Sequence, residues 1–273
     1  MNKEYISYIL IVLMIIENAF TQPIISENAI DYWTPEKMLN AKPLHLPGIK
    51  NKTINNSEKA NLFASEDENE NPLLAVGLFF FTLGGGDYAC TASVINTQDG
   101  NTGMTAKHCL YSNGAHSVNM IFCPGYNKGN TSYLGKISVT DARWADGGDY
   151  GVIKFDYDGG LQYKTGSFGW GLTPSYPVRI ATFGYPVDGD VDCTQDGDTL
   201  CIWRGDADQQ NHANISVPLV LGHGSSGGPW VMANDPSNPK NLGHVIGITA
   251  FIEKSHTYSY ILNFTLIREL ITW

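Results

Sequence analysis

Three residues of the chain have the types and the order that nucleophilic catalysis on an acyl group requires. His108 lies in the pentapeptide TAKHC, Asp149 in GGDYGVIKF and Ser226 in GHGSSGGPW. A serine hydroxyl becomes a nucleophile when a histidine accepts its proton and a carboxylate orients that histidine. These residues therefore predict a catalytic triad that acts through a covalent intermediate on Ser226.

Glycines beside Ser226 predict a site for negative charge. The oxygen of a tetrahedral intermediate needs two backbone N–H donors aimed at one point. Glycine reaches the backbone conformations that such a loop requires, and Gly224 stands two residues before Ser226. We therefore expect the backbone N–H groups of Gly224 and Ser226 to form an oxyanion hole.

The segments that hold these residues have the pattern of strands. From residue 73 onward, short apolar runs alternate with Gly, Asn, Asp and Pro, with about five or six runs on each side of a glycine-rich break at 159–171. This pattern predicts an all-β domain of two antiparallel six-stranded β-barrels, at about 73–157 and 172–273, with the active site between them. Only the stretch 265–273 has helical spacing, which predicts a short C-terminal helix.

Three aspartates compete for the role of orienting carboxylate. Asp149 directly precedes the apolar strand-like run 150–155, where a carboxylate is shielded from water. Asp141 and Asp146 do not adjoin such a run. We therefore assign the role to Asp149.

The first 72 residues differ in composition from the rest. Residues 1–21 contain Lys3, then an apolar run of nine residues, then small and polar residues, which predicts a secretory signal peptide. Residues 22–72 are polar and end in an acidic run, which predicts a pro-segment or flexible extension. An ordered arm wrapped on the domain is the alternative, because an apolar patch surrounds Tyr32, Trp33 and Met38.

The two motifs resemble those of the chymotrypsin-like (trypsin-like) serine peptidases. TAKHC is similar to the T-A-x-H-C of that family, and GSSGGP to its G-x-S-G-G-P. The GSSGGPW ending and FCPGYNKG at 122–129 resemble secreted microbial trypsin-like and glutamyl-endopeptidase-like enzymes in particular. The resemblance covers about residues 75–273. It implies a secreted serine endopeptidase that acts on proteins or peptides without a cofactor or metal ion.

Two residues depart from the family pattern. Ser225 stands where animal members carry an aspartate that captures the new N-terminus on zymogen cleavage. The activation switch that depends on this aspartate is therefore absent. Lys107 replaces the small residue usual before the histidine and adds a positive charge near the base. Neither change removes a member of the triad.

Cysteine content fits an oxidising destination. The resemblance implies that Cys90 and Cys109 form a disulfide that holds the loop of His108. Cys193 and Cys201 enclose a short acidic loop and are candidates for a second bridge. Cys123 lies in an apolar run and is expected to be a free buried thiol.

The resemblance also implies where the substrate side chain binds. The segment before Ser226 forms one wall and the base of the pocket, and the opposite wall falls at 248–252. Val220 occupies the place of the aspartate in trypsin-type enzymes, and Thr249 that of the histidine in glutamyl endopeptidases. We therefore expect an apolar residue on the acyl side of the scissile bond. The candidate pocket residues are Val220, Leu221, His223, Thr249, Ala250 and Phe251.

Histidines other than His108 receive less specific interpretations. His223 flanks the oxyanion loop and is placed to contact substrate, but we interpret it as a loop residue without a catalytic role. His45 falls in the N-terminal extension and is assigned to the solvated surface.

Composition excludes several classes of function. The formal net charge is -10 and no basic run occurs, which argues against nucleic-acid binding. No run approaches the roughly 20 apolar residues of a membrane helix. Alternating aspartates at 188–198 lack the glycine and glutamate of an EF-hand, so no metal site is expected.

Five N-x-S/T sequons make N-glycans candidate partners, at Asn51, Asn55, Asn130, Asn214 and Asn263.

Two other functions use the same sequence features. A secreted binding or adhesion protein on a serine-protease scaffold would carry these motifs without activity, because a fold does not determine a function. An esterase or acyltransferase would use the same triad on another acyl group. Covalent labelling of Ser226 separates an active enzyme from the binding protein.

Overall fold

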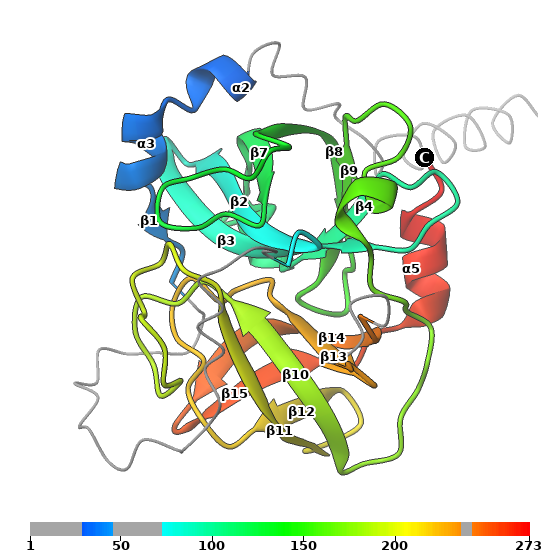
Figure 1. Ribbon diagram of the computed structural model, residues 1–273. Coiled ribbons are helices and arrows are strands. Elements are labelled where there is room, and N and C mark those ends of the chain that lie inside the picture. Colours follow the sequence, from blue (N-terminus) through cyan, green and yellow to red (C-terminus); the bar gives the residue numbers. More distant parts are fainter. Residues whose placement is uncertain (1–28, 46–72, 236–241) are drawn as a thin grey trace, which may run out of the picture.

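The computed structural model describes residues 29–45, 73–235 and 242–273. The predicted signal peptide at 1–21, and the parts 22–28 and 46–72 of the predicted pro-segment, lie outside the described residues. Figure 1 shows two β-barrels, one above the other, with the helices at their edges. No helix in the described ranges has the length and apolar character needed to cross a membrane.

The first barrel contains six strands that close on themselves. Neighbours run in the order β3-β2-β7-β8-β9-β4, and β4 pairs back to β3. All of these pairings are antiparallel. The strands are β2 (Val76–Leu83), β3 (Gly86–Ile95), β4 (Thr102–Thr105), β7 (Val118–Pro124), β8 (Ile137–Trp144) and β9 (Gly151–Phe155).

The second barrel is also closed and antiparallel, in the order β10-β11-β12-β15-β14-β13. Its strands are β10 (Val178–Gly184), β11 (Cys201–Gln209), β12 (Asn214–Val217), β13 (Pro229–Met232), β14 (His244–Glu253) and β15 (His256–Tyr260). The predicted pair of six-stranded barrels is therefore confirmed. Closure removes the free strand edges on which an open sheet would pair with other chains.

Short elements connect and cover the barrels. The helix α5 (Phe264–Leu270) confirms the predicted C-terminal helix, and Asn263 caps it by accepting hydrogen bonds from the backbone N–H groups of Thr265 and Leu266. The remaining short elements of the domain are the 3₁₀ turn η1 (Lys107–Cys109), the hairpin of β5 (Tyr111–Ser112) and β6 (Ala115–His116), and the helix α4 (Gln162–Thr165).

Strand β2 is buried on both faces, unlike a strand with one solvated side. Phe79 and Phe81 stack on one face with ring centroids 5.2 Å apart. Phe80 points to the other face and packs against Trp33, 5.3 Å away. All four side chains are at most 1% exposed. The outer face of β2 is therefore covered by a segment from the N-terminal extension.

That segment, residues 29–45, is called the arm below. It consists of α2 (Ala29–Tyr32), α3 (Pro35–Asn40) and β1 (Lys42–Pro43), which pairs in parallel with β3. Trp33 Nε1 donates to the carbonyl of Asn119, and Lys136 Nζ donates to the carbonyls of Ile30 and Trp33. The described part of residues 22–72 is thus an ordered arm. The sequence had offered this interpretation as the alternative to a flexible extension.

Candidate active site

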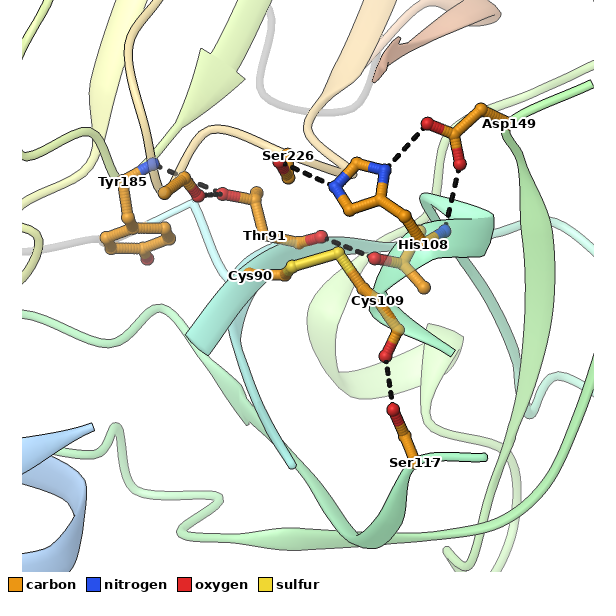
Figure 2. The surroundings of a disulfide bond; sticks show 10 residues. Cys90, Thr91, His108, Cys109, Ser117, Asp149, Tyr185 and Ser226 are labelled. Atoms are coloured by element: carbon orange, nitrogen blue, oxygen red, sulfur yellow. Dashed lines mark hydrogen bonds and ion pairs between the residues drawn. A yellow bond between two sulfur atoms is a disulfide. The ribbon is translucent and has the colours of Figure 1, made fainter. Parts of the chain in front are cut away.

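The two barrels bring the predicted triad together. His108 lies in η1 of the first barrel, Asp149 precedes β9 of the same barrel, and Ser226 lies in the loop before β13 of the second. His108 Nδ1 is 2.6 Å from Asp149 Oδ2, and His108 Nε2 is 2.9 Å from Ser226 Oγ. Figure 2 shows these side chains in one line. This is the arrangement in which imidazole accepts a serine proton.

Asp149 holds the histidine at two points. Its Oδ1 accepts the backbone N–H of His108 at 2.9 Å, while Oδ2 faces the ring nitrogen. The competing carboxylates are engaged elsewhere: Asp146 is fully exposed and pairs with Lys107, and Asp141 pairs with Arg143. Among the three predicted candidates, only Asp149 therefore contacts His108.

Lys107 also points away from the imidazole. Its Nζ donates to the carbonyl of Ala145 at 3.2 Å and lies 3.9 Å from Asp146. The positive charge before His108 is therefore neutralised at the rim of the site rather than placed on the base.

The loop before β13 contains the two predicted oxyanion donors, Gly224 and Ser226. Gly224 has φ +93°, and a Cβ there would lie 2.3 Å from the carbonyl oxygen of Tyr185, so only glycine fits. Ser225 donates its hydroxyl to the carbonyl of Gly222, which closes the turn. Within the described residues, the N–H groups of Gly224 and Ser226 donate to no protein acceptor. Both donors are thus available to a ligand oxygen.

Thr91 ties this loop to the first barrel. Its N–H donates to the carbonyl of Ser226 at 2.8 Å, and its hydroxyl donates to the carbonyl of Gly224 at 2.9 Å. The same hydroxyl accepts the N–H of Tyr185, as Figure 2 shows. Thr91 is fully buried. The backbone and the side chain of Thr91 therefore both hold the loop of the nucleophile against the first barrel.

Both expected disulfides are present. Cys90–Cys109 joins β3 to the turn that carries His108, and Cys193–Cys201 closes the acidic loop before β11. Ser117 donates its hydroxyl to the carbonyl of Cys109, which fixes the far side of the turn. Cys123 is a free buried thiol, and its burial raises the pKa of the thiol far above its usual range. It is therefore an inert part of the core.

An open cleft of about 760 Å³ adjoins the imidazole. Phe251, from β14, contributes an aromatic wall and stacks on Tyr258 with ring centroids 4.9 Å apart. The residues that line the cleft are His108, Asp149, Tyr111, Tyr260 and Phe251, with the adjoining segments 107, 112–113 and 146–148. The cleft thus combines three aromatic side chains with charged and polar residues beside the two first-barrel members of the triad.

The other predicted pocket residues take different positions. Val220 is 6% exposed and packs against Ile252, whereas Leu221 belongs to the core of the second barrel. Ala250 is fully buried. Thr249 is buried too, and its hydroxyl accepts the indole N–H of Trp230 at 2.9 Å. The Thr249 hydroxyl is thus already used within the protein.

A second histidine–carboxylate pair lies beside the oxyanion loop. Asp188 accepts the backbone N–H of His223 at 2.7 Å, and its other oxygen is 2.6 Å from His223 Nδ1. This repeats the two-point contact between Asp149 and His108. The ring of His45 meets the ring of His223 edge-on, with centroids 4.7 Å apart. Sequence reasoning missed both contacts, because Asp188 and His45 are far from His223 in the chain.

Two other aspartates of the acidic loop accept hydrogen bonds from the backbone. Asp190 accepts the N–H of Val220, and Asp196 accepts the N–H groups of Asp198 and Thr199. The carboxylate of Asp198 is partly buried, and desolvation followed by the charge of Asp196 raises its pKa. Asp188, Asp190 and Asp196 thus each serve as acceptors for main-chain N–H groups of the loop walls.

Comparison with known proteins relates the fold to solved proteases. No protein-family model and no curated protein sequence matches this chain. The crystal structure of the protease Anisep from Arthrobacter nicotinovorans is similar, with a TM-score of 0.61 and 27% identity, over 74% of this chain and 95% of that one.

Two further structures share the fold. The thermostable serine protease AL20 from an extremophilic microorganism has a TM-score of 0.61 at 20% identity, over 72% of this chain and 95% of that one. A Glu endopeptidase has a TM-score of 0.56 at 17% identity, over 76% of this chain and 93% of that one. The predicted chymotrypsin-like fold is confirmed.

Proposed function

We propose that this chain, a serine endopeptidase with the chymotrypsin-like fold, cleaves peptide bonds with Ser226 as nucleophile, His108 as general base and Asp149 as the orienting carboxylate. One observation carries the assignment of the residues. An unbroken line of hydrogen bonds runs from Asp149 through His108 to Ser226 Oγ, next to two free backbone N–H groups.

The geometry supports a two-step hydrolysis. Ser226 Oγ attacks the carbonyl carbon of the scissile bond while His108 Nε2 takes the hydroxyl proton and then delivers it to the leaving amine. The N–H groups of Gly224 and Ser226 donate hydrogen bonds to the negatively charged oxygen of the tetrahedral intermediate. Water, deprotonated by the same imidazole, then attacks the acyl ester and releases Ser226.

Substrate preference is a finer part of the proposal. The cleft beside His108 has an aromatic wall at Phe251, and Val220 with Ile252 offers no charge near the segment before the nucleophile. Thr249 offers no cation, and its buried hydroxyl already accepts the indole N–H of Trp230. An apolar residue on the acyl side is thus favoured, by about 1.5–3 kcal/mol for a well-buried side chain.

Secretion completes the proposal. The two disulfides support an oxidising compartment, because disulfides persist there and are rare in the cytosol. The exposed Asn130 is the sequon best placed for a glycan among the described residues, since Asn263 acts as a helix cap and Asn214 lies in β12. Nucleic acid and membrane are not proposed as partners.

A fluorophosphonate probe tests the assignment of the nucleophile. We expect one adduct, on Ser226, because the probe reacts only with a serine whose hydroxyl is activated by a base. Mass spectrometry of digested, labelled protein locates it. The Ser255→Ala variant, which removes an exposed hydroxyl far from the triad, should label normally. Absence of any adduct on folded protein would favour the alternative function, a binding protein on a protease scaffold.

Cleavage of a mixed peptide library tests the preference. We expect apolar residues to dominate directly before the scissile bond, because the candidate pocket residues bring no formal charge to it. Sequencing of the products by mass spectrometry reads the preference at each position. A dominant Lys, Arg or Glu at that position would show that the pocket is formed by other residues.

A further inference from the structure

The tip of the arm, residues 42–45, lies against the residues that surround the oxyanion hole. Lys42 and Pro43 pair with Tyr88 and Ala89 of β3, and the N–H of Leu44 donates to the carbonyl of Ala89 at 3.1 Å. Ala89 directly precedes Cys90 and Thr91, and Thr91 bonds the loop of the nucleophile. The arm therefore continues the first barrel into the immediate surroundings of Ser226.

Two contacts bring the tip onto the oxyanion loop itself. Pro43 Cβ lies 3.5 Å from the position that a Cβ of Gly224 would take. His45 lies edge-on to His223, whose ring is held in place by Asp188. Gly224 carries one of the two proposed oxyanion donors and His223 is its chain neighbour. The arm thus covers one flank of the position where the scissile carbonyl must bind.

A peptide substrate lies on both sides of the position where the scissile carbonyl binds. The chain before the scissile bond and the chain after it leave the bound carbonyl in opposite directions. The open cleft at His108, Asp149 and Phe251 serves one direction. Figure 2 shows Tyr185 and Asp149 on opposite sides of Ser226, and a separate hollow on the Tyr185 side is lined by Pro43, Ala89 and Gly224. The second direction therefore leads into the place where the arm lies.

Resting on the proposed function, we propose that residues 42–45 occupy the leaving-group flank of the active site and exclude substrate residues that follow the scissile bond. The triad itself is untouched, since among the described residues Ser226 Oγ bonds only to His108. The arm is held from a distance by the buried Trp33 and by Lys136. The arm therefore competes with peptides that continue past the scissile bond. It does not compete with substrates whose residues all lie on the acyl side.

Two substrates with the same acyl-side residues test this. One is a peptidyl anilide, in which the aniline is the only group after the scissile bond, and the other is an internally quenched peptide with four residues after it. Leu44→Pro removes the N–H group that donates to the carbonyl of Ala89, and proline is compatible with an extended backbone. His45→Ala removes the ring that contacts His223. Glu36→Gln is the matched control, since this exposed side chain of α3 does not line the separate hollow.

We expect kcat/KM for the quenched peptide to rise about fivefold in each tip variant, because Leu44→Pro loses one hydrogen bond of the competing arm and His45→Ala loses one ring contact. The anilide rates and both rates of Glu36→Gln should stay as in the unchanged chain. Unchanged rates on the quenched peptide in both tip variants would overturn the proposal. A fall would overturn it too, because the tip would then be part of the surface that binds substrate.

Hydrogen exchange separates this proposal from the proposed function. The Leu44 amide is followed in the Ser226→Ala chain with and without a saturating amount of the quenched peptide. Loss of protection on binding supports displacement of the arm, and retained protection overturns it, whatever the turnover measurements give. Failure of the unchanged chain to cleave the anilide would instead count against the proposed function.

Discussion

Replacement of Ser226 by alanine is expected to lower kcat/KM for peptide hydrolysis by about 10⁴- to 10⁶-fold, because the members of a triad act as a unit and the remaining site supplies only binding and oxyanion stabilisation. His108→Ala should have an effect of the same order. Steady-state kinetics on a short fluorogenic peptide measures both variants.

The fold should survive these substitutions. The Ser226 hydroxyl bonds only to His108 among the described residues, and the backbone bonds to Thr91 and Thr249 do not involve either side chain. Near-ultraviolet circular dichroism and thermal unfolding should therefore match the unchanged chain. Peptide hydrolysis by Ser226→Ala at a rate close to that of the unchanged chain would exclude the proposed mechanism.

Asp149→Asn is expected to lower kcat by about 10⁴-fold. The carboxylate accepts both the backbone N–H and Nδ1–H of His108, whereas an amide presents an N–H group to one of them. If the amide N–H faces Nδ1, the imidazole proton moves to Nε2, and the lone pair that should accept the Ser226 proton is lost. The effect should appear in kcat rather than in KM, since Asp149 contacts the base and not the substrate.

Asp146→Asn is the matched control. It removes a negative charge three residues away, from a side chain that is fully exposed and paired with Lys107. Its kcat should stay within about twofold of the unchanged chain, because Asp146 does not contact His108 and an exposed ion pair contributes little. A larger loss of kcat in Asp146→Asn than in Asp149→Asn would show that Asp146, and not Asp149, orients the histidine.

The motifs of the proposed triad could be recognised in the sequence because each is local. His108, Asp149 and Ser226 each lie within a few residues of the glycines, cysteine or strand that define their surroundings. Two strands were harder to recognise: β4 (Thr102–Thr105) and β13 (Pro229–Met232) have four residues each. Runs of that length carry little periodicity, and their pairing partners decide their conformation.

The arm and the pair of Asp188 with His223 depend on contacts that sequence spacing does not encode. The arm's two helices have four and six residues, too short for an apolar face to repeat, and Trp33 is buried only because Phe80 lies opposite it. His223 was recognised as a neighbour of the oxyanion loop, but its carboxylate partner lies 35 residues earlier. Such long-range pairings become visible only when the barrels are placed together.

Because the triad is divided between the two barrels, enzymatic activity depends on how the barrels pack against each other. His108 and Asp149 belong to the first barrel and Ser226 to the second, and Thr91 supplies the hydrogen bonds that hold the two sets in register. A slight separation or rotation of the barrels would lengthen the bond from His108 to Ser226 while each barrel kept its own strands paired. In mild denaturant, catalysis should therefore be lost before circular dichroism detects any melting of the sheets.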